Sequence, residues 1–257
     1  MTEDGGSDRL REELRRYERD SRFLRKDSDD RKTMEEVFDR ATLLVLRQLM
    51  RQGAISELNG IVSSGKEARV YWGVTAEGTN RAVKIYLTVS AEFRRRLNYI
   101  AGDRRFGKLP SNSREMIFIW VRKEFKNLQL AESAGIRVPK PYAFEKNVLS
   151  MEFIGTPPAP APIFAESEVD EKDYEWTFDT ISKLYNSAGL VHADLSEFNF
   201  FKNGTELVLF DFGSAVLESH PQAIEFLTRD IKNMVRFFKK RGIGTREPED
   251  WLEEITK

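Results

Sequence analysis

The sequence contains no cysteine and only two histidines, His192 and His220. Disulfides and thiolate metal sites are therefore excluded, and two imidazoles are too few for an ordinary structural zinc site. Any bound metal is expected to have oxygen ligands. Long apolar runs are also absent, and the first residues, MTEDGGSD, are acidic and polar. We therefore expect a cytoplasmic protein with no signal peptide and no membrane interaction.

The composition is nevertheless that of a folded protein. Of the 257 residues, 40% are hydrophobic and 32% are charged, and the net charge is only −1. This length fits one large domain or two small domains around a cleft, with enough apolar side chains to form a core.

The stretch 191–213, VHADLSEFNFFKNGTELVLFDFG, carries the strongest functional pattern. Asp194 stands in an H-x-D-L sequence, Asn199 follows five residues later, and a D-F-G triplet begins at Asp211. This is the spacing of the catalytic and metal-binding loops of protein kinases. The residues between the two loops predict a β-hairpin with a type I′ turn at Asn203-Gly204, which would bring the three side chains together.

Phosphoryl transfer requires such an arrangement. Asp194 would orient or deprotonate an attacking hydroxyl, while the amide oxygen of Asn199 and the carboxylate of Asp211 would hold Mg²⁺ on the phosphates of ATP. The alternative is that both aspartates only cap turns. The combined spacing of the motifs favours phosphoryl transfer.

A second motif lies at 60–70. Gly60 and Gly65-Lys66 resemble a Walker A loop, but Glu67 stands where Ser or Thr is required. The same residues fit the kinase glycine-rich loop, with small side chains at all three glycine positions. An ordinary turn between two strands is the alternative. The residues predicted to bind phosphate are Ser63, Ser64, Gly65 and Lys66.

Lys84 lies in an alternating strand, at the position of the nucleotide-binding lysine of kinases. Its partner is expected on the helix predicted at 113–134, where Glu124 falls inside an apolar stripe and would be costly to bury unpaired. Glu115 and Glu132 are less favourable partners because they lie nearer the helix ends.

The segment 90–115 has seven Lys or Arg residues against three Asp or Glu residues. A long basic loop inside a compact domain is typically functional or flexible. Contact with RNA or phosphate and a flexible insert remain equal alternatives. Ser111 and Ser113 are candidate autophosphorylation sites.

Three regions are expected along the chain. Residues 1–53 would form a disordered tail and two accessory helices, the second running from Ser28 or Asp29 to Gly53. Residues 54–155 would form a β-rich lobe and 156–257 a helical lobe, joined by a stiff, extended proline-rich connector at 156–162.

The last strand of the β-rich lobe would place the backbone of Glu152 and Ile154 at an adenine edge. After Gly213 only 44 residues remain, which leaves no room for the peptide-binding helices of an ordinary kinase. The main helix of this part is expected to bury Ile224, Leu227, Ile231, Met234, Val235 and Phe238.

The chain resembles the RIO family of atypical protein kinases, in its type 1 branch. The resemblance rests on SSGKEA at 63–68, FIW and KEF within 118–125, MEFIG at 151–155 and LVHADLSEFN at 190–199. It implies an α+β, truncated bilobal protein-kinase-like fold with extra N-terminal helices. Ser214 departs from the pattern, since Gln is expected after D-F-G in this branch.

The resemblance also implies function. Asp194 would be the catalytic base, Asn199 and Asp211 the metal ligands, Lys84 a phosphate contact, and Asp211 a candidate acceptor for an aspartyl-phosphate. ATP with Mg²⁺, or alternatively Mn²⁺, serine autophosphorylation and ATPase activity are implied. The implied partners are a pre-small-subunit ribosomal particle and its rRNA.

Two other function classes share some of these features. A small-molecule phosphotransferase of the aminoglycoside or choline type has a similar catalytic loop and also lacks the peptide platform. An ATP-gated assembly factor would use the nucleotide as a switch without a protein substrate.

Overall fold

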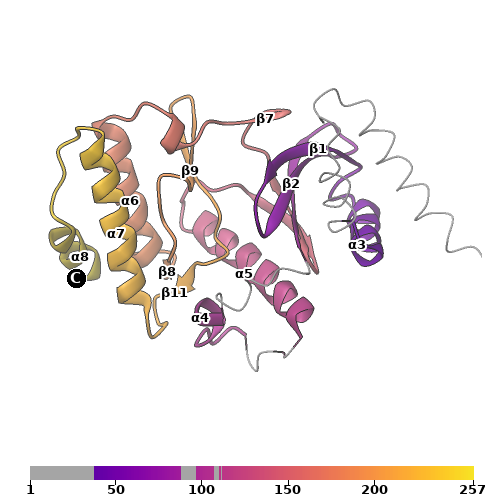
Figure 1. The fold of residues 1–257 in the computed structure, drawn as a ribbon, viewed down its shortest axis with the longest axis horizontal. Helices are drawn as coiled ribbons and strands as arrows, with labels where there is room; N and C mark the ends of the chain where they lie inside the picture. Colours follow the sequence, from indigo (N-terminus) through magenta and orange to yellow (C-terminus); the bar gives the residue numbers. More distant parts are fainter. Residues whose placement is uncertain (1–37, 88–96, 107–109, 111) are drawn as a thin grey trace, which may run out of the picture. The chain divides into compact units, whose positions relative to one another are not determined.

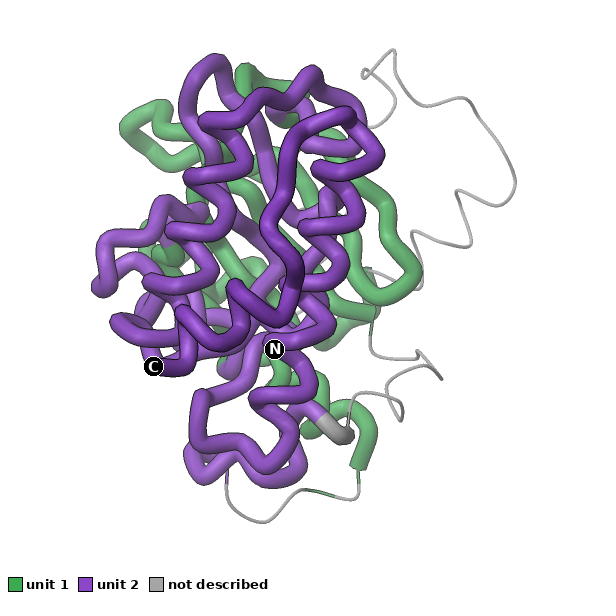
Figure 2. The backbone as a smooth tube through the Cα atoms, turned by 90° about the vertical axis from the view of Figure 1, so that its left-hand side faces the viewer, with its two compact units in different colours: residues 1–93, 110–122, 141–160 green, residues 94–109, 123–140, 161–257 purple. Residues whose placement is uncertain are grey.

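A computed structural model describes residues 38–87, 97–106, 110 and 112–257. These residues belong to two compact units, coloured green and purple in Figure 2. Unit 1 contains the described parts of 1–93, 110–122 and 141–160, and unit 2 those of 94–109, 123–140 and 161–257. Helix α5 (Ser113–Ser133) therefore contributes its first half to unit 1 and its second half to unit 2.

Unit 1 is built on a five-stranded antiparallel sheet with the order β1-β2-β3-β5-β4. Figure 1 labels its strands β1 and β2. Consecutive strands pair as hairpins, and the order departs from the sequence only where β5 lies between β3 and β4. The strands are β1 (Glu57–Ser64), β2 (Ala68–Val74), β3 (Asn80–Tyr86), β4 (Pro141–Glu145) and β5 (Val148–Glu152).

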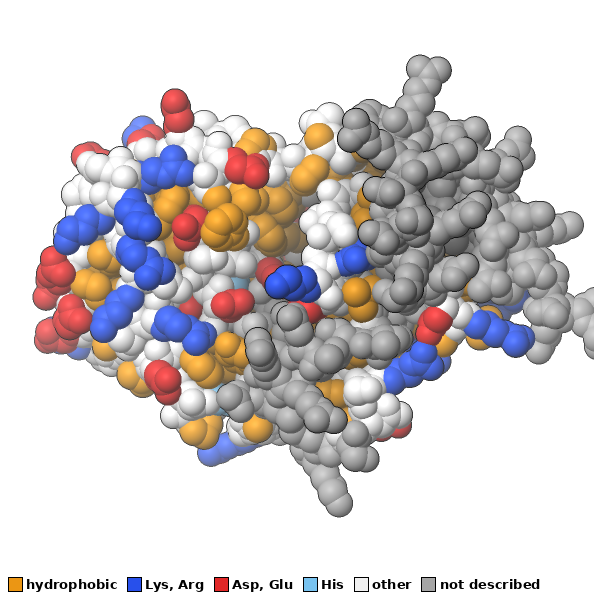
Figure 3. All heavy atoms as spheres, in the orientation of Figure 1, with side chains coloured by type: hydrophobic (Ala, Val, Ile, Leu, Met, Phe, Trp, Pro, Cys, Tyr) orange, Lys and Arg blue, Asp and Glu red, His pale blue; other side chains and the backbone are white. Residues whose placement is uncertain are grey.

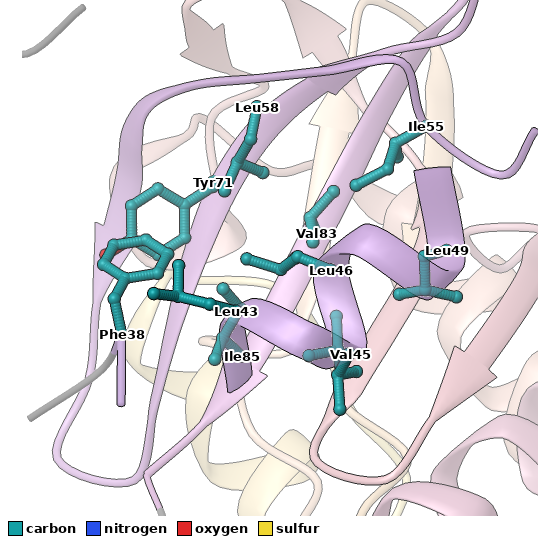
Figure 4. Close-up of a cluster of buried hydrophobic side chains, with 11 residues drawn as sticks. Phe38, Leu43, Val45, Leu46, Leu49, Ile55, Leu58, Tyr71, Val83 and Ile85 are labelled. Carbon is teal, nitrogen blue, oxygen red and sulfur yellow. The ribbon is translucent and has the colours of Figure 1, made fainter. Parts of the chain in front are cut away.

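Helix α3 (Arg40–Arg51) packs against one face of this sheet (Figure 4). The helix begins at its N-cap Asp39, whose carboxylate accepts the N–H of Thr42 at 2.7 Å. The buried amide of Asn147, in the β4–β5 turn, donates to the hydroxyl of Thr42 and to the carbonyl of Tyr86, both at 3.0 Å. The core of unit 1 consists of Phe38, Leu43, Val45, Leu46, Leu49, Ile55, Leu58, Tyr71, Val83, Ile85 and Val148.

Unit 2 is mainly helical. Helices α6 (Glu171–Asn186), α7 (Ala223–Lys240) and α8 (Pro248–Thr256) share an aromatic core, in which Phe178 stacks on Trp251 and Phe164 on Phe200. The shorter elements are α4 (Leu97–Ile100), η2 (Phe164–Glu166), β8 (Leu190–Val191), β9 (Phe200–Asn203), β10 (Glu206–Leu209) and β11 (Val216–Leu217).

Several expectations from the sequence need correction. The second accessory helix was expected to run without a break from Ser28 or Asp29 to Gly53, but Phe38 and Asp39 are non-helical and α3 covers only Arg40–Arg51. Residues 1–37, with the first predicted helix, lie outside the described part. Ile224 is 48% exposed rather than inward, since its position on α7 falls next to the buried stripe and not in it.

The predicted connector at 156–162 does not run as an extended segment. Strands β6 (Gly155–Thr156) and β7 (Ala159–Pro160) pair antiparallel, so the chain reverses at Pro157-Pro158. Local turn geometry at these two prolines prevails over their preference for an extended chain.

The structure describes part of the expected basic loop at 90–115. Residues 97–106 contain α4 and the buried side chains of Ile100, Asp103 and Phe106. Residues 88–96, 107–109 and 111 lie outside the described part, and Ser111 is among them. Within the described ranges, every helix is too short or too polar to cross a bilayer.

Candidate active site

The predicted catalytic loop follows strand β8. At Ala193 the backbone takes a left-handed conformation, with φ of 65°, which is uncommon outside glycine. The chain turns sharply there, so that Asp194 is exposed while Ala193 and Leu195 on either side of it are buried.

Three side chains of α7 hold the backbone of this loop. The buried carboxylate of Asp230 accepts the N–H groups of Ala193 at 2.7 Å and Leu195 at 2.9 Å. Arg229 donates to the carbonyl of Ala193, and Asn233 donates to the carbonyl of Leu195 at 3.0 Å. The backbone groups on both sides of the predicted base are thus fixed by one helix.

Burial perturbs two ionisable groups next to this loop. It raises the pKa of Asp230 to about 7, although the backbone N–H donors and Arg229 act in the opposite direction. It lowers the pKa of His192 to about 4. The Nε2 atom of His192 lies 3.1 Å from the carbonyl oxygen of Phe210, so the neutral ring carries its proton on Nε2.

The hairpin of β9 and β10 brings the two loops together. Asn203 pairs with Glu206 next to the turn, and Phe200 pairs with Leu209 at the other end of the hairpin. Beyond that last pair, the N–H of Phe210 donates to the carbonyl of Asn199 at 2.9 Å. Asn199 and Asp211 therefore lie at the same end of one hairpin, as the sequence predicted.

The turn type of this hairpin differs from the prediction. The paired residues leave Gly204 and Thr205 as the loop, and only Gly204 has a positive φ, of 66°. A type I′ turn needs positive φ at both loop residues, whereas glycine first is the pattern of a type II′ turn.

The D-F-G loop is held from α5. Its first residue, Asp211, is exposed and has a φ of 67°, whereas Phe212 is fully buried. The ammonium of Lys123 donates to the carbonyls of Gly213 at 2.9 Å and Ala215 at 2.5 Å. Lys123 has no exposed surface, so the D-F-G loop is held by a fully buried side chain of unit 2.

Asn127 adds to this support one helical turn after Lys123. Its Nδ2 atom donates to the carbonyls of Phe212 at 3.0 Å and Ala215 at 2.8 Å. The backbone that carries the predicted metal ligand is thus held by two wholly buried side chains.

The donor set at this place fits Mg²⁺. Asp211 offers a carboxylate, and Asn199 an amide oxygen, which in this structure accepts hydrogen bonds of 2.9 Å from the N–H and the hydroxyl of Ser196 and would exchange one of them for the metal. Mg²⁺ prefers oxygen and takes one or two carboxylates together with phosphate oxygens and water.

The other predicted residues lie in unit 1, except Glu124. Residues directly opposite one another in antiparallel strands share a face, and Ser63, Val70, Lys84 and Leu149 form one such row across β1, β2, β3 and β5. Ser63 and Lys84 are therefore on the same face. This face is opposite to the one covered by α3, because the core residues of β3 alternate with Lys84.

The predicted phosphate-binding loop is a tight hairpin turn. The N–H of Gly65 donates to the carbonyl of Ala68 at 3.0 Å, and Arg69 donates to the carbonyl of Gly65. Ser63, Ser64, Gly65 and Lys66 are all exposed.

The remaining predicted contacts are divided between the units. Glu152 ends β5 opposite Arg81, and Ile154 is buried two residues later. Glu124 is 1% exposed and belongs to unit 2, whereas Lys84 belongs to unit 1, so their ion pair stays a prediction.

Sequence reasoning missed the residues that support the loops: Lys123, Asn127, Arg229, Asp230 and Asn233. A signal was present, because Asp230 interrupts the apolar stripe of α7, as Glu124 does on α5. A polar residue inside a buried stripe needs partners.

Comparisons with known proteins identify the family. A family model described as RIO1, RIO domain, matches residues 69–250. RIO-type serine/threonine-protein kinase Rio1 of Haloferax volcanii is 40% identical, covering 93% of this chain and 83% of that protein. Its namesake in Methanocaldococcus jannaschii is 39% identical, with coverages of 88% and 77%. Human serine/threonine-protein kinase RIO1 is 37% identical, but this chain spans only 42% of its length.

Solved structures give the same fold. The Rio2 kinase-ADP/Mg²⁺-phosphoaspartate complex from Chaetomium thermophilum matches with a TM-score of 0.64 at 18% identity, covering 82% of this chain and 65% of that one. The expected kinase-like α+β fold is confirmed. With the family match and the archaeal relatives, it follows that the chain belongs to the RIO family of atypical serine/threonine protein kinases, in its RIO1 branch.

Proposed function

We propose that the protein transfers the γ-phosphoryl group of ATP to a serine hydroxyl. Asp194 takes the hydroxyl proton while the hydroxyl oxygen bonds to the γ-phosphorus, and the bond from that phosphorus to the bridging oxygen of ADP breaks. The observation that carries this proposal is the fixed backbone on both sides of Asp194, held by Asp230.

ATP and Mg²⁺ would be bound by residues of both units. Asn199 and Asp211 would hold Mg²⁺, which neutralises charge that develops on the phosphates. In unit 1, Lys84 and the turn at 63–66 would bind phosphate oxygens, and the backbone of Glu152 and Ile154 would meet the adenine. Mn²⁺ would fit the same oxygen donors.

Incubation with γ-labelled ATP and Mg²⁺ tests this function, with label on the chain and free phosphate followed together. We expect label on serine in the natural protein and a loss of about 10²–10⁴-fold in Asp194→Ala, with nearly unchanged ATP binding. Asp179→Ala, an exposed aspartate on α6, is the matched control. Equal labelling in both variants would contradict the role of Asp194.

The same experiment separates the rival functions. Free phosphate that dominates over serine label would favour the ATPase as the main activity, in an ATP-gated assembly factor. ATP binding with neither product would lead to a screen of small-molecule acceptors of the aminoglycoside or choline type. Self-labelling is expected at Ser113, which is exposed at the start of α5, or at Ser111.

We further propose a role in small-ribosomal-subunit maturation, with rRNA as a partner. The exposed face of α7 supports it, because Lys and Arg side chains form a row there (Figure 3). They line a shallow hollow with Glu247 and Pro248. The row consists of Lys232, Arg236, Lys239 and Lys240.

RNA binding would be measured with a small-subunit rRNA fragment at several salt concentrations. Replacing Lys239 and Lys240 by Glu should weaken binding and reduce the salt dependence, because fewer phosphates are neutralised. Affinity equal to that of the natural protein would exclude this face.

A further inference from the structure

A short stretch of unit 2 is connected to both loops of the catalytic site through the side chains of Asn127 and Arg229. We call residues 97–106 the α4 segment. It is anchored by a 2.9 Å hydrogen bond between Nε2 of His220 and the carbonyl of Ala101. Gly102 has a φ of 98°, and a Cβ atom there would lie 3.2 Å from the ring of Pro221, so the segment runs close to the start of α7.

The first connection runs from Arg105 to the D-F-G loop. Its Nη1 atom donates to Oδ1 of Asn127 at 2.8 Å, and Nδ2 of the same amide donates to the carbonyls of Phe212 and Ala215. An amide has one acceptor end and one donor end. Because Arg105 occupies the acceptor end, the donor end of Asn127 is turned toward the D-F-G backbone.

Arg105 is itself held in place. Its Nε and Nη2 atoms donate to the carboxylate of Asp103 at 2.9 and 2.7 Å, a two-pronged arrangement that fixes the plane of the guanidinium. Burial acts to raise the pKa of Asp103, but hydrogen bonds from Arg105 and the charge of Lys123 lower it overall. Asp103 is therefore ionised, and the pair with Arg105 is a charged one.

The second connection runs from Tyr99 to the catalytic loop. The Tyr99 ring lies 5.2 Å from that of Phe226, and its hydroxyl oxygen accepts a hydrogen bond from Arg229, which also donates to the carbonyl of Ala193. This carbonyl precedes Asp194 directly. Arg229 is exposed, so this connection lies at the surface, whereas the one through Asn127 is buried.

We propose that the α4 segment positions both loops of the catalytic site, Arg105 through Asn127 and Tyr99 through Arg229. The proposal rests on the kinase function and adds two positioning residues to it. Because the two connections end on different loops, they should affect different steps. Arg105 should govern the response to Mg²⁺, and Tyr99 the turnover that depends on Asp194.

The experiment measures turnover and nucleotide binding as a function of Mg²⁺ in Arg105→Ala and Tyr99→Phe. Arg105→Ala should raise the Mg²⁺ concentration for half-maximal activity by about tenfold or more, the usual range for a residue that orients a metal ligand. Tyr99→Phe keeps the ring stack and should lower kcat several-fold with an unchanged Mg²⁺ response. Arg104→Ala, the exposed neighbour with the same charge change, is the control and should match the natural protein.

Folding is controlled with Arg105→Lys, which keeps the charge beside Asp103 but lacks the planar fork that reaches Asn127. It should fold and still show the shifted Mg²⁺ response. The proposal would be overturned if both Arg105 variants had the same Mg²⁺ dependence of activity as Arg104→Ala. It would also be overturned if their loss of activity were the same at limiting and at saturating Mg²⁺. If the natural protein transfers no phosphate, the kinase function fails, and the Mg²⁺ dependence of ATP binding alone decides the role of Arg105.

Discussion

Two buried ionisable side chains beside the catalytic loop respond to pH in opposite directions. Asp230 has its pKa raised from 3.8 to about 7, so its protonated form stabilises the fold below pH 3.8, and this contribution is lost as the pH rises through 7. His192 has its pKa lowered from 6.5 to about 4, so its contribution is present above 6.5 and is lost as the pH falls through 4. Between pH 4 and pH 6.5 the two contributions to the unfolding free energy therefore change in opposite directions and largely cancel.

Asp230→Asn removes one side of this balance. The unfolding free energy of the natural protein minus that of this variant should fall by about 3 kcal/mol between pH 5 and pH 8, at about 1.4 kcal/mol per pKa unit. Urea denaturation at several pH values measures it. Asp179→Asn on the exposed face of α6 should parallel the natural protein throughout, and a pH-independent difference for Asp230→Asn would refute the raised pKa.

At the scale of single residues, the sequence predicted the exposed functional side chains but not the residues that hold their backbone in place. Asp194, Asn199 and Asp211 stand in recognisable spacings. The residues that hold their backbone do so through hydrogen bonds to individual carbonyl and N–H groups. Such contacts do not require a fixed spacing in the sequence, so no motif reveals them. Asn127 is an example, because its role depends on Arg105, 22 residues away.

Among the elements, α3 shows how much one helix face contributes to unit 1. Leu46 is fully buried against the sheet (Figure 4), whereas Leu44 on the same helix is 52% exposed. Helical spacing in the sequence placed Leu44 with Val45 and Leu49 on the buried stripe, and for Leu44 this is wrong. The buried stripe of α3 also contains Leu43 and Leu46, which the sequence pattern did not include. The interruption of the predicted helix at Phe38 and Asp39 was missed because no proline or glycine stands there to signal it.

Leu46→Ala should lower the unfolding free energy by about 2–5 kcal/mol, because it leaves a cavity beneath the sheet. Leu44→Ala should change it by less than about 0.5 kcal/mol, since it removes only exposed surface. Denaturant unfolding of the two variants measures the contrast. Equal effects would mean that α3 does not pack on the sheet as described.

Over the whole molecule, the residues proposed to bind nucleotide are distributed over both compact units. Sequence patterns identified each group from its local motif. They could not establish the pair of Lys84 and Glu124, because a pairing between distant segments depends on tertiary structure. The proline reversal at 157–158 was missed for a similar reason, since the same residues suit an extended chain and a turn.

Binding of Mg-ATP should stabilise the folded protein by mass action. At a free ligand concentration of about 100 times Kd, the gain is about 2.7 kcal/mol, which a thermal unfolding scan detects as a higher Tm. In Asp211→Ala the Mg²⁺-dependent part of this shift should vanish. A shift that survives in Asp211→Ala would remove that carboxylate from the metal site.

The hairpin of β9 and β10 also bears on how the chain can change over time. Its base is closed by the Phe210 N–H and the Asn199 carbonyl, while its tip at Gly204-Thr205 lies at the far end of the strands. Residues inserted at the tip need not alter the base. The interval between the catalytic and metal-binding loops is therefore free to lengthen in evolution or by design, and the tip is a place where a peptide tag could be inserted without displacing Asn199 or Asp211.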